Sequence, residues 1–274
     1  MKYVIITILY RRGEKMVITS KDNEFVKHLK RLKEKKYREE FGEFIVEGVK
    51  MIQEAIDEKA KIKQIVICDD CKTQGNFSSE FLYEIAKYDC VYVTEKIFLQ
   101  ITDVMNPQGI LAVIDKKVDK SEIDYTSNLF LILDNIQDPG NMGTILRTAD
   151  SINLKQIIVA KGTADCYNPK VVRSTMGAIF RVKVIECENL ENVVKEMKKR
   201  KIKVYATDLA TDKSIYDVNY NKSAIIIGNE ANGVSKNLLD LATQKIKIPM
   251  IGKTESLNAA VATGSILYEA IRKR

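Results

Sequence analysis

The chain has 274 residues, of which 45% are apolar and 30% charged, and this balance is typical of a soluble globular protein. It excludes intrinsic disorder and collagen, and apolar runs such as those at 129–133 and 224–227 are too short to cross a bilayer. The net charge of +7 permits a polyanionic partner such as nucleic acid without requiring one.

The cysteines and the first residues bear on where the protein works. Five cysteines do not form a disulfide framework in a protein this long, so we expect reduced thiols and a cytoplasmic location. Cys68 and Cys71 form a single CxxC beside only one histidine in the sequence, so we expect no metal. In residues 1–15 the arginines follow the apolar stretch, unlike a secretory signal. We expect this segment to be an N-terminal extension without a role in the fold, and we expect no membrane partner.

Strands and helices alternate in the first half of the sequence, which predicts a small α/β domain over 16–115. It begins with a basic helix over 20–39, since residues 19–38 carry eight Lys or Arg against three acids. The elements predicted after it are strands at 43–48, 64–68, 91–93 and 110–114, and helices at 49–60 and 80–87. The polar stretch 116–127 is the predicted linker.

The second half alternates more regularly and predicts an α/β domain over 128–274. Its strands are uniformly apolar, which indicates a parallel sheet covered by helices on both faces. Strands are predicted at 129–134, 156–160, 182–186, 203–208, 223–228 and 245–249, and helices at 143–151, 169–178, 190–201, 235–242 and 257–272. Ligands of such sheets bind at the carboxyl ends of the strands, so we expect the site in the loops after Asp134, Gly228 and Pro249.

The first of these loops leads from a buried strand through amides, carboxylates and glycines into a helix that opens near Asn141. Such residues let the backbone approach a ligand and leave helix N–H groups free for an anion. Arg147 follows within this helix, on the side predicted to face the loop. The same residues are also ordinary turn formers and caps, with Arg147 on a solvated face.

The second and third loops are ambiguous when each is taken alone. Gly228 ends a strand and allows close approach to a flat ligand, but the loop lacks the GxGxxG fingerprint of dinucleotide binding. In the third loop Ser256 and Asn258 lie where a helix begins, which is also the place of ordinary capping residues.

Taken together, the three loops resemble in order and spacing the three motifs of the SpoU family, the TrmH-like RNA ribose 2′-O-methyltransferases of the SPOUT class. The matching segments are NIQDPGNMGTILRTA at 135–149, GNEANGVS at 228–235 and, within 248–262, IPM followed by ESLNAAVA. The segment 172–178 is similar to the helix between the first two motifs. Residues 18–114 resemble the substrate-binding domain that often precedes this one, which is similar to small ribosomal RNA-binding proteins.

The resemblance implies an α/β protein with two domains. The SPOUT domain over 128–274 would contain a mostly parallel sheet and a deep trefoil knot, and the small domain before it would be ribosomal-protein-like. The implied cofactor is S-adenosylmethionine, bound in the knot, and the implied assembly is a homodimer. The implied cofactor-binding residues are Gly228, Ile248, Leu257, Glu230 and Asn258.

The implied reaction is in-line transfer of a methyl group from sulfur to a ribose 2′-oxygen of RNA, which needs positioning and proton removal but no metal. The implied catalytic residues are Arg147, Asn141, Glu230, Ser256 and Asn258. Asn141 and Arg147 would meet the RNA, Ser256 and Asn258 would close the pocket, and Glu230 would order the second motif. Arg147 resembles the arginine proposed in the family to activate the 2′-hydroxyl. Because arginines stay protonated, we expect it at least to bind the target phosphate and 2′-oxygen, with acceptance of the proton as the alternative role.

We expect RNA contacts at Lys30, Lys33, Lys35, Lys36 and Arg38 of the basic helix and at Arg173. Charge runs of this kind are also typical of a solvated helix face. The preceding domain favours 23S ribosomal RNA as substrate, with transfer RNA as the alternative. Other possibilities are a base-methylating enzyme of the same class, a non-catalytic RNA-binding protein, and a nucleotide-dependent oxidoreductase, against which the missing glycine fingerprint counts.

Overall fold

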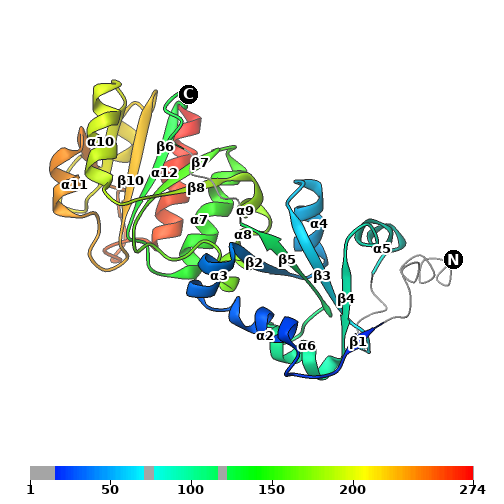
Figure 1. Ribbon diagram of the computed structural model, residues 1–274. Coiled ribbons are helices and arrows are strands. Elements are labelled where there is room, and N and C mark those ends of the chain that lie inside the picture. The colour runs from blue at the N-terminus through cyan, green and yellow to red at the C-terminus, as the bar shows by residue number, and fades with distance from the viewer. Residues whose placement is uncertain (1–15, 71–76, 117–121, 274) are drawn as a thin grey trace. The chain divides into compact units, whose positions relative to one another are not determined.

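The structure is a computed structural model that describes residues 16–70, 77–116 and 122–273. The protein divides into two compact units (Figure 1). The first contains Met1–Asp119 and Tyr167–Phe180, and the second contains Lys120–Cys166 and Arg181–Arg274. The expected extension over 1–15 and residues 117–121 of the expected linker lie outside the described residues.

No helix among the described residues combines the length and the apolar character that crossing a membrane requires.

The first unit is built on a five-stranded sheet with the order β1-β4-β3-β5-β2. β1, β4 and β3 are parallel, whereas β5 is antiparallel to both β3 and β2. An apolar core lies between this sheet and the helices α2 and α6. The elements are β1 (Val17–Ile18), α2 (Glu24–Arg31), α3 (Lys35–Phe41), β2 (Glu43–Glu47), α4 (Val49–Asp57), β3 (Ile62–Cys68), α5 (Ser79–Ile85), β4 (Cys90–Val93), α6 (Glu95–Ile101) and β5 (Ile110–Asp115).

The basic segment forms two helices, so the prediction of one helix over 20–39 is wrong. α2 ends at Arg31 and α3 begins at Lys35. The physical reason is Arg38, which is only 2% exposed and donates from Nη1 to the main-chain oxygens of Leu32 and Lys33 at 2.8 and 2.7 Å. These carbonyls follow the last turn of α2 and have no helical donor, so the buried guanidinium satisfies them.

The segment Tyr167–Phe180 belongs to the first unit, although the residues directly before and after it in the sequence belong to the second. It contains α8 (Pro169–Thr175) and most of α9 (Ala178–Arg181). α8 packs against β2, and the ring of Phe44 lies 4.8 Å from that of Tyr167 and 6.4 Å from that of Phe180, centroid to centroid. A division of the sequence at 116–127 into two contiguous parts does not anticipate this exchange.

The second unit contains a six-stranded sheet, entirely parallel, with the order β11-β9-β10-β6-β7-β8. The strands are β6 (Leu129–Asp134), β7 (Gln156–Ala160), β8 (Lys183–Cys187), β9 (Lys203–Thr207), β10 (Ser223–Gly228) and β11 (Gln244–Ile246), and the helices are α7 (Pro139–Ser151), α10 (Leu190–Lys199), α11 (Lys236–Leu241) and α12 (Ala259–Arg272). All six predicted strands are present. β11 is shorter than predicted because Lys247 leaves β9 and forms a bridge with Ser214 instead.

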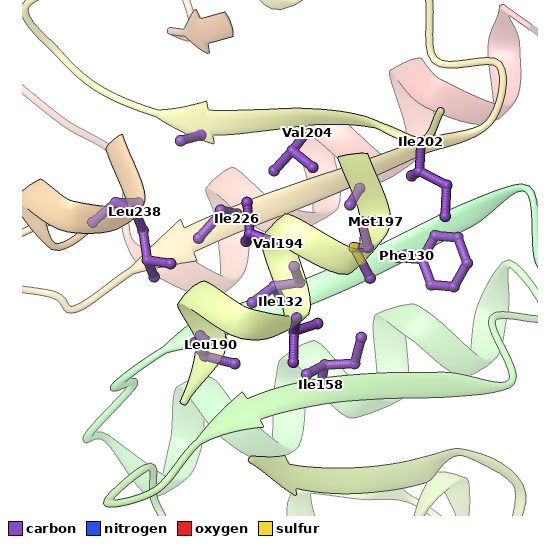
Figure 2. Close-up of a cluster of buried hydrophobic side chains, with 14 residues drawn as sticks. Phe130, Ile132, Ile158, Leu190, Val194, Met197, Ile202, Val204, Ile226 and Leu238 are labelled. Atoms are coloured by element: carbon purple, nitrogen blue, oxygen red, sulfur yellow. The ribbon is translucent and has the colours of Figure 1, made fainter. Parts of the chain in front are cut away.

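One face of this parallel sheet carries the apolar cluster shown in Figure 2. Leu190, Val194 and Met197 of α10 lie over the middle strands, and Leu238 of α11 completes the cover. Alternate residues of β6, β9 and β10 contribute, such as Phe130 and Ile132 of β6. Their neighbours in the strand are buried as well and point to the opposite face, where α12 packs against α7 and β10. Burial on both faces explains why these strands are apolar without interruption.

Among the described cysteines, Cys90, Cys166 and Cys187 are not disulfide-bonded, whereas Cys68 is. The expectation of reduced thiols is therefore wrong for Cys68, the last residue of β3, where the backbone leaves the sheet. Burial raises the pKa of Cys90 to about 11, which keeps this thiol protonated and unreactive at neutral pH.

Candidate active site

The first two loops of the predicted site meet because their strands are neighbours. β6 and β10 pair in parallel register with Asp134 opposite Gly228, so both loops leave the sheet at the same edge. Asn229 Nδ2 donates to the main-chain oxygen of Asn135 at 2.9 Å, and Asp134 Oδ2 accepts from the main-chain N–H of Ser235 at 2.7 Å. Each loop is therefore held by the strand end of the other.

Glu230 binds the start of α7. Its carboxylate accepts from the main-chain N–H groups of Gln137 and Asp138, both at 3.1 Å, and from Asn141 Nδ2 at 2.9 Å. Asp138 is the N-cap of α7 and accepts from the N–H of Asn141 at 2.8 Å. Burial raises the pKa of Glu230, but the hydrogen bonds from Asn141, Gln137 and Asp138 outweigh it and hold the pKa below its usual value. The ionised carboxylate thus joins the second loop to the first.

Asn258 joins the third loop to Asn141 at the start of α7. Its Nδ2 donates to Asn141 Oδ1 at 2.8 Å, while its Oδ1 accepts from the N–H groups of Ala260 and Val261 and caps α12. Asn141 is 8% exposed, and both ends of its amide are engaged. In the structure Asn141 therefore bridges Glu230 and Asn258, and its expected contact with RNA stays a prediction.

Gly228 is required by the loop itself. A Cβ at this position would lie 2.0 Å from the carbonyl carbon of Gly233 and 2.0 Å from the amide nitrogen of Val234. The loop folds back here, with Asn229 and Gly233 exchanging two main-chain hydrogen bonds of 3.0 and 2.9 Å. The main chain of Gly233 and Val234 therefore takes the space that the missing Cβ leaves. From the sequence we had expected a ligand there.

A cavity of about 590 Å³ opens where the second and third loops face the ends of β9 and β10. Its wall includes all five residues expected to bind the cofactor, Gly228, Glu230, Ile248, Leu257 and Asn258, together with Ser256. Asp208, Leu209 and Glu255 also line it and were not predicted. Asp208 and Leu209 directly follow the carboxyl end of β9, and that position was the available signal.

Arg147 stands apart from the other four predicted catalytic residues. It lies on the exposed side of α7, six residues after Asn141, and does not line the cavity. Within the part of the protein that the structure describes, its side chain forms no hydrogen bond or ion pair. Ser256 is exposed at the cavity wall, and Asn141, Glu230 and Asn258 form a hydrogen-bonded series.

The residues expected to contact RNA differ in how far they are already engaged. Lys30 Nζ donates to Gln100 Oε1 at 2.7 Å, and Lys33 pairs with Asp103 at 2.9 Å. Lys35 lies 3.6 Å from Glu39, and Lys36 is exposed with its Nζ 5.5 Å from the centroid of the Tyr37 ring. The expectation for Arg38 is corrected, because its buried guanidinium already binds two carbonyls.

Two further basic residues, Arg173 and Arg31, are candidates for contact with RNA. Arg173 lies in α8, where its charge helps to lower the pKa of Glu47, although burial of that carboxyl is stronger and raises the pKa overall. Arg31 was not predicted, but it is exposed and its guanidinium lies 5.7 Å from the Tyr37 ring centroid. The available signal was its place in a basic run that also contains Tyr37.

Two family models match the sequence, the SpoU rRNA Methylase family over residues 128–268 and the MRM3-like substrate binding domain over 23–112. The 23S rRNA (guanosine(2553)-2′-O)-methyltransferase RlmP of Bacillus subtilis (strain 168) is 33% identical over 252 residues, covering 92% of this chain and 97% of the relative. The AdoMet-bound rRNA methyltransferase from Sinorhizobium meliloti has a TM-score of 0.81 at 30% identity, covering 95% of this protein and 98% of the other. The SpoU methyltransferase AviRb from Streptomyces viridochromogenes, in complex with AdoMet, has a TM-score of 0.81 at 27% identity, covering 91% and 97%.

The SpoU rRNA Methylase model spans the parallel sheet and all three motif loops, so the class of protein is an RNA methyltransferase. The SpoU family model covers half of the sequence, and the match to RlmP extends over nearly the whole of both proteins. The chain belongs to the SpoU rRNA methylase family.

The cavity suits S-adenosylmethionine in size and in lining. Its volume of about 590 Å³ is in the range of small-ligand sites. Leu209, Ile227 and Leu257 give apolar wall for a flat ring. The carboxylates of Glu230 and Glu255 lie in the same wall and favour a ligand that carries a positive sulfonium and an ammonium group.

Proposed function

We propose that the protein transfers a methyl group from S-adenosylmethionine to the 2′-hydroxyl of a ribose in 23S ribosomal RNA. The observation that carries the proposal is the hydrogen-bonded series Glu230–Asn141–Asn258, which holds all three motif loops around one cavity. The names of three relatives support the target, since RlmP, RlmB of Bordetella pertussis and an enzyme of Streptomyces viridochromogenes are each called a 23S rRNA 2′-O-methyltransferase. Transfer RNA is the alternative substrate.

S-adenosylmethionine supplies the methyl group when it is bound. The ribose 2′-oxygen would take this methyl group from sulfur and lose its hydroxyl proton to bulk water, so that the cofactor would leave as the neutral thioether. The work of the protein is to hold the two reacting atoms in line, which is worth several orders of magnitude in rate. Glu230 and Asn258 fix the loops that form the cavity wall, and Asn141 keeps the start of α7 at a constant place beside them.

In this proposal Arg147 binds the substrate. Its guanidinium has no partner among the described residues, and its planar fork can bind a phosphate oxygen and the 2′-oxygen together. A guanidinium stays charged at neutral pH, so it suits stabilising negative charge on the oxygen better than accepting the proton.

In the same proposal the two domains have different functions. Residues 16–115 bind the RNA, 128–274 form the methyltransferase domain, 116–127 are the linker, and the enzyme works in the cytoplasm. The deep trefoil knot and the likeness of the first domain to ribosomal proteins are part of the proposal. So is the homodimer, which the exposed Val261 and Tyr268 on one side of α12 support, since they are 54% and 52% exposed.

The test uses purified protein, S-adenosylmethionine with a tritiated methyl group, and unmodified ribosomal and transfer RNA pools that are digested to nucleosides afterwards. We expect label in a 2′-O-methylnucleoside from 23S ribosomal RNA. Label on a base would contradict the reaction, and label in transfer RNA alone would contradict the substrate. Absence of label from both pools together with absence of cofactor binding would support a non-catalytic RNA-binding role, whereas absence of label with intact cofactor binding would contradict both proposed substrates.

A further inference from the structure

The first unit contains a cavity of its own, of about 510 Å³, lined by none of the motif loops. Four aromatic rings line it, those of Phe41, Phe44, Tyr167 and Phe180. Two of them come from the segment Tyr167–Phe180, which packs on β2. We call this cavity the aromatic pocket.

The rings are not packed as a closed stack. Phe44 and Tyr167 are tilted by 50°, and Phe44 and Phe180 by 36°. Phe44 and Phe180 are buried, at 2% and 5% exposed, and form the floor, whereas Tyr167 is half-buried. Phe44 and Phe180 thus belong to the core, whereas Tyr167 keeps part of its surface accessible at the wall of the pocket.

The aromatic pocket is also strongly basic. Lys59, Lys61, Lys63 and Lys116 line it against one carboxylate, that of Asp115. Asp115 is shared, since Lys61 Nζ lies 2.6 Å and Lys63 Nζ 3.7 Å from its two oxygens, and Lys63 also binds Glu43. Lys116 Nζ lies 4.8 Å from the centroid of the Tyr167 ring. Lysines that line a pocket together with aromatic rings are typical of single-strand sites, where a base stacks on a ring and a cation binds its phosphate.

From these contacts we infer that the aromatic pocket binds one unpaired nucleotide of the RNA substrate. The base stacks on Tyr167, and Lys116 and Lys59 bind the flanking phosphates. A duplex does not fit, because its bases are stacked on one another and only its backbone reaches a concave site. The inference rests on the proposed function for the identity of the substrate as RNA, and it names the unpaired segment that the first unit reads.

The sequence contains no tryptophan, so a single introduced tryptophan reports on one site. Tyr167→Trp keeps a stacking ring in the aromatic pocket. Tyr83→Trp is the matched control, because Tyr83 also carries a lysine over its ring, Lys87 at 4.9 Å, but lies exposed on α5 outside the pocket. Both variants are titrated as full-length protein with an oligoadenylate of about nine nucleotides, a usual length for single-strand sites, with a duplex RNA of the same length, and with AMP.

We expect the oligoadenylate to quench the tryptophan of Tyr167→Trp and not that of Tyr83→Trp, and we expect the duplex to quench neither. Adding Lys116→Ser to Tyr167→Trp should weaken the quenching and reduce its dependence on salt. In a competition assay, Tyr167→Ala should weaken oligoadenylate binding about 5- to 150-fold, the loss expected for one stacked base.

Equal quenching of the two tryptophans, or quenching of Tyr167→Trp by the duplex, would overturn the inference. Binding of AMP as tightly as of the oligoadenylate would also overturn it, since the pocket would then be a mononucleotide site. Methyl transfer by the wild-type protein is measured separately. Transfer without quenching would refute the pocket alone, and quenching without transfer would refute the proposed function alone.

Discussion

Asn258 Nδ2 donates a hydrogen bond of 2.8 Å to Asn141 Oδ1, and the two residues are 117 positions apart in the sequence. Asn141 in turn donates to Glu230 at 2.9 Å. Asn258 and Glu230 also bind main-chain groups at the start of a helix, Asn258 at α12 and Glu230 at α7. The polar residues that hold the starts of two helices are therefore the same residues that place the cavity wall.

Asn141→Asp should disrupt this hydrogen-bonded series. It places a carboxylate oxygen where Nδ2 now donates to Glu230 Oε1, so that two carboxylates meet at hydrogen-bond distance. We expect a loss of about 1–3 kcal/mol in the free energy of unfolding, because a donor is replaced by a second negative charge. Urea unfolding measures the stability, and calorimetry measures S-adenosylmethionine binding, which should weaken.

The double variant Asn141→Asp with Glu230→Gln is the control for this prediction. The glutamine amide can donate to the new carboxylate, so the double variant should recover part of the stability that Asn141→Asp loses. Losses that simply add in the double variant would contradict a direct interaction between positions 141 and 230.

The parallel sheet of the second unit was predictable, whereas the joining of its loops was not. The apolar strands indicate the sheet because a strand buried on both faces needs no polar residue and its pattern is unambiguous. The contact between Asn141 and Asn258 depends on which loops the sheet brings together, and pattern alone does not contain that information. The break after Arg31 was missed because its cause, the buried Arg38, looks like one more cation in a basic run.

The exchange of Tyr167–Phe180 between the units was also not predictable. The segment has the composition of any amphipathic helix, and its partner β2 lies more than a hundred residues earlier in the sequence. Propensity and periodicity describe a local segment, whereas the face on which it packs is a tertiary choice.

Gly228→Ala should destabilise the second unit severely. The added Cβ would lie 2.0 Å from main-chain atoms of Gly233 and Val234, and main-chain atoms cannot move aside as a side-chain end can. We expect a loss of about 3 kcal/mol, at the upper end for overpacking, and weaker cofactor binding. Gly252→Ala is the matched control, since its Cβ would have no neighbour within 4 Å, and it should melt like the wild type. Equal melting temperatures of the two variants would refute the argument.

Glu230 predicts a specific dependence of stability on pH. Its hydrogen bonds lower the pKa below the usual 4.5, so the folded state favours the ionised form more than the unfolded state does. This contribution is present in full above the unfolded pKa and is lost as the pH falls through the folded pKa. The stability difference between wild type and Glu230→Gln should therefore be constant near neutral pH and shrink below pH 4.5. Urea titrations at a series of pH values measure it, and a difference that grows at low pH would reverse the sign and refute the prediction.

Arg147→Lys should separate substrate binding from cofactor binding. The variant keeps the positive charge but loses the planar fork, so we expect methyl transfer to fall by about two orders of magnitude. Cofactor affinity should stay the same because Arg147 does not line the cavity. Arg200→Lys, at the end of α10 where the side chain pairs with Glu196 at 2.8 Å, is the control and should transfer at the wild-type rate. Wild-type turnover of Arg147→Lys would remove Arg147 from the proposed mechanism.

The basic residues around α2 and α3 should contribute unequally to RNA binding. Arg31 and Lys36 are exposed beside the Tyr37 ring, at 5.7 and 5.5 Å from its centroid, whereas Lys33 is already bound to Asp103 and to the main-chain oxygen of Thr102. Replacing Arg31 and Lys36 with serine should weaken RNA binding and lower the slope of log K against log salt by about 0.7–0.9 for each phosphate that the protein no longer neutralises. Lys33→Ser should leave that slope unchanged and lower the melting temperature instead. Filter binding over a salt series measures the slope for both sets of variants. A slope that falls for Lys33→Ser but not for the replacement of Arg31 and Lys36 would contradict the prediction, because the lysine already bound to Asp103 would then be the one that contacts the RNA.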